Sequence, residues 1–233
     1  MFLADRKYKL DNGIYSFINE ALLTGDNLKY KNLYDRIAWA YNLSQRLYFW
    51  FKFGGEQKFR EPFLYELDIK DTDKVLEISV GTGDNFRFLN NRAEYFGVDI
   101  SIGMLRQAKK HLKKWKIKST LIHAEGENLP FEDEYFDVVF HCGGINYFNN
   151  KQKAILEMIR VAKPGTKILI VDETDKLVRE NYQKNPILKR KYQEDSKAFI
   201  PTDLVPKEMI EIRTEVICKG LMYKLTFIKP HNK

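Results

Sequence analysis

Short β-rich runs alternate with helical stretches from Asp71 to about Thr174, and this rhythm constrains the fold more than any other feature. The β-rich runs are KVLEISV, EYFGVDI, STLIHAE, FDVVFHC and KILIVDE, and the helical stretches are NFRFLNN, MLRQAKKHLKKW and QKAILEMIRVA. Because strand–helix–strand units pair their strands in parallel with right-handed crossovers, the rhythm predicts a doubly wound α/β fold. The tail TEVICKGLMYKLTFIKP predicts an antiparallel hairpin at the sheet edge, which completes a mostly parallel, seven-stranded sheet.

An aromatic segment precedes the alternating region. It runs from Tyr30 to Tyr65, and its pattern predicts a helix that ends at the Gly54-Gly55 pair. We expect residues 1–70 to form an N-terminal helical lid and residues 71–233 to form the α/β domain, with a C-terminal helix on the substrate side and closing strands. The candidate lid side chains, which would exclude water above the strand ends, are Trp39, Tyr48, Phe49, Trp50 and Phe53. The alternative is that these aromatics only pack the helix onto the sheet.

The composition is that of an ordinary globular chain of 233 residues, 44% hydrophobic and 30% charged. No apolar stretch approaches the ~20 residues of a membrane-spanning helix, and the first residues lack the apolar core of a secretory signal. The two cysteines, Cys142 and Cys218, have no metal-site or disulfide-framework spacing. These features predict a cytoplasmic protein without a transmembrane segment, and they leave peripheral membrane contact open.

The positive charge is concentrated in one segment. The net charge is +7, and Arg106 to Lys118 contains seven basic residues and no acidic one. Leu105, Ala108 and Leu112 fall at helical spacing in or beside this stretch, which favours an amphipathic helix with a solvated basic face. A nucleic-acid-binding stripe is the alternative.

A glycine turn and two carboxylates point to the ligand. Gly81 and Gly83 follow the first strand of the alternating region, where the backbone turns sharply and can approach a ligand. The third glycine of a dinucleotide fingerprint is replaced by Phe86, and no Lys-Ser/Thr pair follows, so neither a dinucleotide nor a Walker-type phosphate site is expected. Asp99, sixteen positions after Gly83, can accept both hydroxyls of a ribose, or it caps the next helix. With Glu77 available for a cationic group, the pattern favours a positively charged nucleoside, S-adenosylmethionine.

The ordered motifs VLEISVGTGDN, EYFGVDISIGML, HAEGENLPFEDEYFDVVF and VAKPGTKILIVDE resemble those of class I S-adenosylmethionine-dependent methyltransferases. The chain is most similar to the ubiquinone/menaquinone C-methyltransferase type (methyltransferase type 11), and YDRIAWAYNLSQRLYF also resembles that family's N-terminal helix. The resemblance spans roughly Tyr34 to Glu173 and implies a Rossmann-like fold and S-adenosylmethionine as cofactor. Ser79-Val80 departs from it, because most relatives have a glycine or small residue there.

The resemblance implies a set of cofactor contacts. Glu77, Ser79, Gly81 and Gly83 would line the methionine and ribose end, and Tyr41 would reach the cofactor's carboxylate. Asp99 would bind the ribose, and Ile100 and Met104 would pack on adenine. Glu125 would accept the adenine amino group, Gly126 would offer a backbone N–H, and His141 would lie beside the cofactor.

The loop HCGGINYF, after the fourth strand of the alternating region, is where a methyl acceptor is expected, and its polar candidates for catalysis are His141, Asn146 and Tyr147. It lacks the Asn/Asp-Pro-Pro-aromatic segment with which amino-methyltransferases hold a flipped adenine. Four scattered histidines give no metal-site spacing. We therefore expect metal-independent transfer to a small, apolar or aromatic acceptor such as a quinol or phenol, and no nucleic-acid partner. An RNA methyltransferase and a catalytically inactive nucleoside-binding protein are the alternatives.

Overall fold

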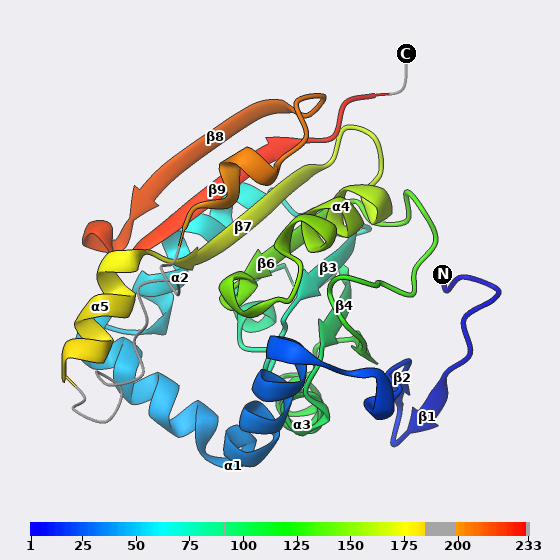
Figure 1. Ribbon diagram of the computed structural model, residues 1–233, viewed down its shortest axis with the longest axis horizontal. Helices are drawn as coiled ribbons and strands as arrows, with labels where there is room; N and C mark the ends of the chain where they lie inside the picture. The colour runs from blue at the N-terminus through cyan, green and yellow to red at the C-terminus, as the bar shows by residue number, and fades with distance from the viewer. Residues whose placement is uncertain (91, 185–198, 232–233) are drawn as a thin grey trace.

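A single mixed sheet organises the computed structural model, which describes residues 1–90, 92–184 and 199–231 (Figure 1). The strand order is β1-β2-β5-β4-β3-β6-β7-β9-β8, parallel from β2 to β7 and antiparallel at both edges. The strands are β1 Lys9–Asp11, β2 Ile14–Ser16, β3 Lys74–Ile78, β4 Glu94–Asp99, β5 Ser119–His123, β6 Val138–Cys142, β7 Lys167–Glu173, β8 Ile210–Ile217 and β9 Met222–Ile228. The doubly wound α/β prediction and the C-terminal hairpin are confirmed.

The predicted count of seven strands is wrong, because the N-terminal hairpin β1–β2 adds two more. Asn12 and Gly13 both have positive φ, +48° and +74°, which suits a tight hairpin turn. β2 then pairs in parallel with β5, with Ile14 opposite Leu121. The prediction missed these strands because three-residue strands are too short to show an alternating pattern. Part of residues 1–70 thus belongs to the sheet rather than to a helical lid.

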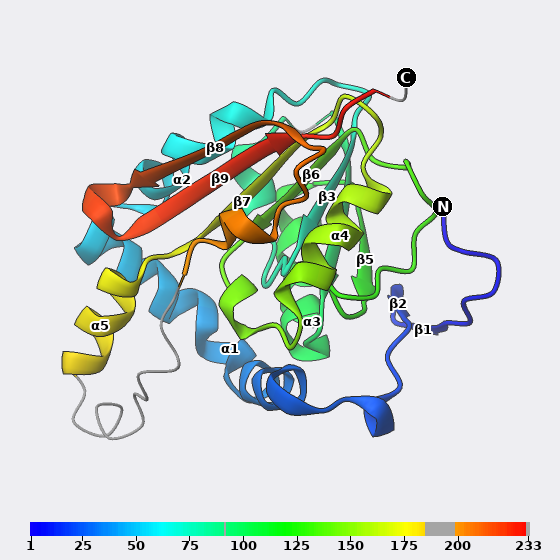
Figure 2. The same cartoon turned by 45° about the horizontal axis from the view of Figure 1, so that its top comes forward.

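In the part of the chain that the structure describes, five α-helices surround the sheet: α1 Gly25–Phe53, α2 Glu56–Leu64, α3 Ile102–Trp115, α4 Lys151–Val161 and α5 Asp175–Lys184. α4 covers one face of the sheet, and α2 lies on the opposite face (Figures 1 and 2). The first core, under α4, includes Phe96, Phe131 and Phe136, and the second, under α2 and α3, includes Phe63 and Phe140. Burial of both sheet faces explains why the strand sequences are nearly continuous hydrophobic runs.

The aromatic segment is helical up to the predicted break. α1 ends at Gly54, which adopts φ +77° and donates its N–H to the Trp50 carbonyl at 3.2 Å. This left-handed cap is a conformation that glycine adopts without steric cost. No helix within residues 1–90, 92–184 and 199–231 is both long enough and apolar enough to cross a membrane.

The predicted helix NFRFLNN forms only a 3-10 turn, Asn85–Phe88. The face that such a helix would cover is already occupied by α2, whose Phe59 and Phe63 share the core with Phe86. The glycine turn is therefore followed by a short turn rather than by a full helix.

Candidate active site

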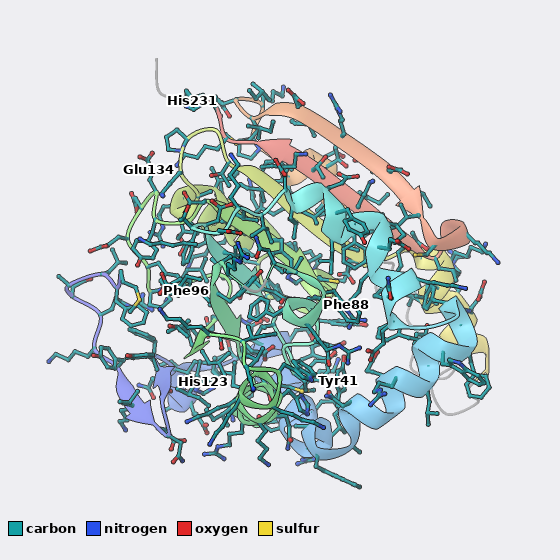
Figure 3. The ribbon with its side chains drawn as sticks, turned by 180° about the vertical axis from the view of Figure 1, so that it is seen from behind. Tyr41, Phe88, Phe96, His123, Glu134 and His231 are labelled. Carbon is teal, nitrogen blue, oxygen red and sulfur yellow. The ribbon has the colours of Figure 1, made fainter. Side chains whose placement is uncertain are left out.

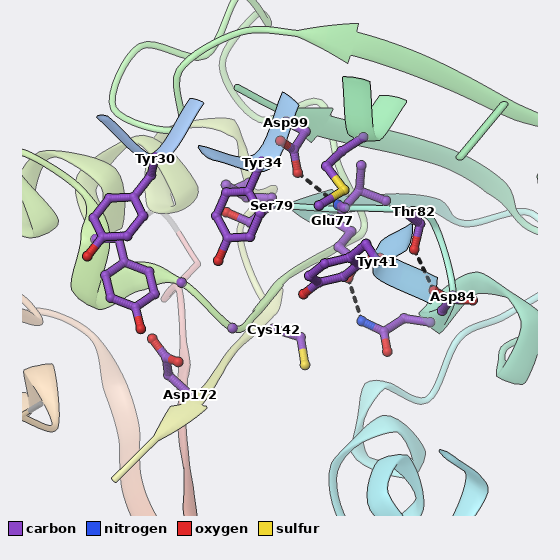
Figure 4. A pocket seen from close by; sticks show the side chains of 18 of the residues that line it. Tyr30, Tyr34, Tyr41, Glu77, Ser79, Thr82, Asp84, Asp99, Cys142 and Asp172 are labelled. Carbon is purple, nitrogen blue, oxygen red and sulfur yellow. Dashed lines mark hydrogen bonds between the residues drawn. The ribbon is translucent and has the colours of Figure 1, made fainter. Parts of the chain in front are cut away.

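A cavity of about 430 Å³ lies between α1 and the carboxyl ends of the central strands (Figure 4). Its walls come from the ends of β3, β4, β6 and β7 with the turns that follow them, and from α1, with smaller contributions from α2 and α5. Strand order reverses beside β3, so the cavity occupies the switch point at which doubly wound sheets bind ligands. Its volume is typical of a small-molecule site.

The two glycines of the turn have different tasks. Gly81 and Gly83 adopt φ +54° and +78°, and the Gly83 N–H donates to the Val80 carbonyl at 2.9 Å. A Cβ on Gly81 would meet no atom within 4 Å, whereas one on Gly83 would lie 3.2 Å from Leu112 Cδ1. Gly81 therefore leaves space for a ligand, and it lines the cavity. Gly83 does not line the cavity, and it allows α3 to pack closely against the turn.

Asp99 holds the same turn at the end of β4. One of its carboxylate oxygens accepts the Gly81 N–H and the other accepts the Ser101 N–H, both at 2.8 Å. Burial raises the pKa of Asp99 to about 6, although these backbone hydrogen bonds oppose the shift. Each oxygen retains a second lone pair, so Asp99 can still accept hydrogen bonds from vicinal hydroxyls. The capping alternative is wrong, because Ser101 caps α3 by accepting the Met104 N–H at 3.1 Å.

Glu77, at the end of β3, belongs to a buried polar chain. Its Oε1 accepts the Asn85 amide N–H at 2.5 Å, and Asn85 in turn accepts the Arg60 Nε–H at 2.7 Å. The Glu77 carboxyl is 1% exposed, and burial raises its pKa well above the usual range. Its second oxygen, Oε2, is buried without a hydrogen-bond partner among the described residues, although Glu77 lines the cavity. An unpaired acceptor of this kind fits a cationic group such as the ammonium of S-adenosylmethionine.

The other predicted cofactor residues divide into two groups. Tyr41, Ser79, Ile100, Met104 and Gly126 line the cavity, and Figure 4 shows Tyr41 across from the β3 and β4 ends. The lining does not include Glu125, although its neighbours Ala124 and Gly126 belong to it. Burial raises the pKa of Glu125, and the nearby Glu127 adds to that shift.

The structure separates the three candidate catalytic residues. His141 is 1% exposed, its Nδ1 donates to the Ile78 carbonyl at 3.1 Å, and its ring is not part of the cavity lining. Burial lowers the pKa of His141 to about 4, so its ring is neutral near pH 7. Asn146 donates from both its backbone N–H and its amide to Asp172 at 3.3 Å, and it does not line the cavity either. Tyr147 lines the cavity, where its ring lies 4.2 Å from that of Tyr30.

Two carboxyl groups end β7 beside this loop. Asp172 is 3% exposed, and its hydrogen bonds with Asn146 and the Glu173 N–H hold the loop in place. Glu173 lines the cavity, and its carboxyl accepts no hydrogen bond from the residues that the structure describes. Burial raises the pKa of Glu173 to about 7, and the neighbouring Asp172 contributes to the shift. Glu173 and Asp99 are therefore both carboxyl groups of the cavity with a raised pKa, and only Asp99 of the two already accepts backbone hydrogen bonds from the described residues.

α1 is attached to the start of α3 through Asp35. The carboxylate accepts the Ser101 O–H at 2.6 Å and the Gly103 N–H at 2.8 Å, and Lys31 pairs with it at 3.2 Å. A Cβ on Gly103 would lie 3.0 Å from the Asp35 Cα, so the glycine permits this close approach. Burial tends to raise the pKa of Asp35, but these partners outweigh it and the pKa is lowered.

Only part of the candidate aromatic lid faces the cavity. Tyr48, Phe49 and Phe53 line it, whereas Trp39 is 81% exposed and Trp50 is 64% exposed. The prediction for these two tryptophans is wrong, because they lie on the outer side of α1. Aromatic content identifies a helix with apolar contacts but does not say which side of it faces inward when both sides carry aromatics.

Sequence reasoning missed Arg60, Asn85, Glu173 and the tyrosines Tyr30 and Tyr34, all of which line the cavity. A signal for Arg60 was present, because it falls among Phe59, Phe63 and Leu64 on the buried side of α2. A charged residue on an apolar helix face requires a polar partner inside the protein. Here the partner is Asn85, and the guanidinium also lies 5.1 Å from the ring centroid of Phe49.

Backbone strain accompanies the departure at Ser79, which adopts φ +59°. A residue with a Cβ loses about 1–2 kcal/mol of folding free energy in this left-handed region. Glycine avoids that strain, but its more flexible unfolded chain lowers the free energy of unfolding by about 0.4–1 kcal/mol. We expect Ser79→Gly to raise the free energy of unfolding by about 0.5–1 kcal/mol in urea titrations. Ser79→Ala, which keeps the Cβ, is the control and should give no gain. A Ser79→Gly variant less stable than Ser79→Ala would contradict the strain argument.

Comparisons with known proteins relate this chain to methyltransferases. Residues 76–170 match the family model described as a methyltransferase domain. Over 143 residues, the chain is 35% identical to ubiquinone/menaquinone biosynthesis C-methyltransferase UbiE of Syntrophotalea carbinolica and 33% identical to demethylmenaquinone methyltransferase of Thermotoga maritima. Each match covers 60% of this chain and 59% of the relative, so the chain spans less than two thirds of these curated relatives.

The fold has close structural neighbours. An S-adenosylmethionine-dependent methyltransferase from Aquifex aeolicus superposes with a TM-score of 0.56 and 21% identity, over 72% of this chain and 88% of that one. The predicted resemblance to class I S-adenosylmethionine-dependent methyltransferases of the ubiquinone/menaquinone type is confirmed by the family model and the curated relatives, and the Aquifex aeolicus structure shares the fold.

Proposed function

We propose that this chain, whose residues 76–170 are a methyltransferase domain, transfers a methyl group from S-adenosylmethionine to a small aromatic acceptor such as a quinol or phenol. The observation that carries the proposal is one cavity with two unlike ends. Gly81, Asp99 and Glu77 form a polar cradle on one side, and Figure 4 shows Tyr30 and Asp172 on the other side. Glu173, next in the chain to Asp172, also lines the cavity. One curated relative is named as a ubiquinone/menaquinone biosynthesis C-methyltransferase and the other as a demethylmenaquinone methyltransferase, and the first name supports carbon as the atom methylated.

The cradle suits each part of the cofactor. Asp99 offers acceptors to the ribose hydroxyls, and Ile100 and Met104 offer apolar surface to adenine. The buried Glu77 Oε2 offers an unpaired acceptor to the ammonium group, whose positive charge would favour the ionised form of the Glu77 carboxyl, and Arg60, which also lines the cavity, offers a cation to the cofactor's carboxylate. When bound, S-adenosylmethionine supplies a methyl group activated for direct displacement from its sulfonium.

The acceptor end suits a planar ring that carries a hydroxyl. Tyr30, Tyr34 and Tyr147 line it, and aromatic surfaces of this kind bind flat rings by stacking. We assign Glu173 as the general base that removes the hydroxyl proton, which places negative charge on the ring and makes its carbon nucleophilic. The protein must then align the ring carbon with the methyl group, whose bond to sulfur breaks as its bond to carbon forms. The hydrogen on that carbon leaves as a proton to water while the oxygen regains one, which restores the aromatic ring.

The alternatives receive less support from the structure. Arg106–Lys118 lies on α3 and the residues after it, and none of its residues lines the cavity. A charged surface away from the cradle does not favour RNA as the acceptor. An inactive nucleoside-binding protein would not need a carboxyl group that titrates near pH 7 beside the cradle.

Binding and turnover test the proposal together. Calorimetry is expected to give micromolar affinity for S-adenosylmethionine, about −8 kcal/mol, and no competition by NAD. Incubation with methyl-labelled cofactor and a panel of demethylated quinols and phenols, read by mass spectrometry, should yield a C-methylated product, also with a chelator present. Methylation of RNA alone would favour an RNA methyltransferase. Tight cofactor binding with no product from any acceptor would favour an inactive nucleoside-binding protein.

A further inference from the structure

The outer side of α1 carries large apolar side chains that the fold leaves exposed. Trp39 is 81% exposed, Trp50 64%, Phe51 77% and Leu47 51%. Exposed tryptophans on a helix that also uses its inner side to line a cavity are not needed for packing. The rings of Trp50 and Phe51 contact each other, with centroids 4.8 Å apart, and exposed apolar side chains gathered in this way mark interaction sites.

Basic side chains share this outer side. Arg36, Trp39, Arg46 and Trp50 are spaced by three, seven and four residues, so they fall on one stripe of the helix. Arg36 and Arg46 are exposed, and neither forms an ion pair with any residue in the described ranges. Tryptophan and arginine together on one helix face are typical of helices that lie in a membrane interface.

The neighbouring helix extends the positive charge. α3 contains five basic residues and no acidic one, and its Lys110 and Lys114 are exposed beside His111, which contacts Asn42 of α1. Figure 3 shows α1 and α3 together at the end of the molecule opposite His231. An anionic surface is the partner that matches this charge.

The cavity opens next to the same helix. Leu33 and Ile37 line the cavity, yet they are 45% and 36% exposed. They lie on α1 between its inner tyrosines and its outer tryptophan and arginine stripe. An apolar molecule leaving a lipid layer under α1 would thus meet an apolar rim before the cavity.

We propose that the outer side of α1, with the basic face of α3, docks on an anionic lipid bilayer, from which an apolar acceptor enters the cavity past Leu33 and Ile37. The exposed apolar side chains and the positive charge support the docking itself, whereas the entry of an acceptor from the bilayer rests on the proposed function. A second copy of the chain or RNA on this face are the competing outcomes.

Tryptophan fluorescence gives a direct test. The chain has three tryptophans, and Trp115→Phe leaves only Trp39 and Trp50 as reporters. Vesicles of equimolar phosphatidylcholine and phosphatidylglycerol are expected to shift the emission of this variant to the blue and to sediment with the protein, whereas pure phosphatidylcholine should bind it far more weakly. An unshifted emission in the mixed vesicles would overturn the proposal.

Matched variants identify the surface. Arg36→Gln with Arg46→Gln should weaken sedimentation with the mixed vesicles about 10- to 30-fold at low salt. Trp39→Ala with Trp50→Ala should weaken it about tenfold or more. The controls are Tyr65→Ala, for a 74% exposed aromatic, and Arg92→Gln with Arg213→Gln, and both should bind like the wild type. Equal losses in controls and test variants would overturn the proposal.

Two further readouts separate the competing outcomes. Analytical ultracentrifugation of the free protein would overturn the proposal if it showed a dimer that the tryptophan variants dissociate. RNA that binds this surface more tightly than the vesicles would also overturn it. Calorimetry with S-adenosylmethionine on the same preparations keeps the two proposals distinct, because vesicle binding can fail while cofactor binding and methyl transfer persist.

Discussion

Replacing Glu173 by glutamine is expected to lower kcat about 100- to 10,000-fold, the usual contribution of a positioned general base. Glu173→Gln keeps the shape of the side chain, and Glu173 lies at the acceptor end of the cavity rather than in the Gly81–Asp99 cradle. Calorimetric affinity for S-adenosylmethionine should therefore stay within about twofold of the wild type. A variant with full activity on the preferred acceptor would remove Glu173 from the mechanism.

The pH dependence provides the matching signature. Because the pKa of Glu173 lies at about 7, kcat/KM of the wild type should rise with pH through 7 and then level off, and Glu173→Gln should lack this rise. Stability should respond in the opposite direction. A carboxyl group whose pKa is higher in the folded than in the unfolded state destabilises the fold when it ionises. The free energy of unfolding should therefore fall as the pH rises from the ordinary pKa of a glutamate, near 4.5, through 7. Glu173→Gln should abolish that part of the loss, measured as Tm against pH.

Replacing Asp99 by alanine is expected to weaken S-adenosylmethionine binding about 10- to 100-fold, since a charged acceptor for two hydroxyls contributes about 1.5–3 kcal/mol. The substitution also leaves the Gly81 and Ser101 N–H groups without their acceptor, which loosens the turn that faces the ligand. Calorimetry on folded protein, with Tm measured beside it, checks the prediction.

Asp137 supplies the control for this variant. Its carboxylate also accepts a backbone N–H, that of Lys74 at 2.9 Å, but at the opposite end of β3. Asp137→Ala should lower Tm and leave cofactor affinity unchanged. If both variants weakened binding equally, the effect of Asp99 would be one of general stability rather than of ribose recognition.

Local sequence patterns were sufficient to predict the central strands of the sheet and to place Gly81 and Asp99 at their carboxyl ends. Strand runs such as KVLEISV and EYFGVDI are buried on both faces, and they read as strands because short runs of mostly apolar residues dominate them. Gly81 and Asp99 were predictable because the ends of adjacent parallel strands always meet at the same edge of the sheet.

The acceptor end was less predictable because it depends on which way side chains point. Position in a loop cannot distinguish His141, whose ring turns into the core, from Tyr147, whose ring lines the cavity. The sequence places Glu173 at the end of a strand, but it does not predict the raised pKa of Glu173, which arises mainly from burial in the folded chain. The same limit applies to Trp39 and Trp50, since α1 carries aromatic residues on both sides.

Ser101 is shared between two aspartates. Its N–H donates to Asp99, which we expect to bind the ribose, and its O–H donates to Asp35 of α1. Any shift of this residue that improves one hydrogen bond is therefore felt by the other. We therefore expect ribose binding and the attachment of α1 to be thermodynamically linked, and linkage is reciprocal. A cofactor that tightens the Asp99 side makes α1 harder to detach, and a protein with α1 detached binds the cofactor more weakly by the same factor.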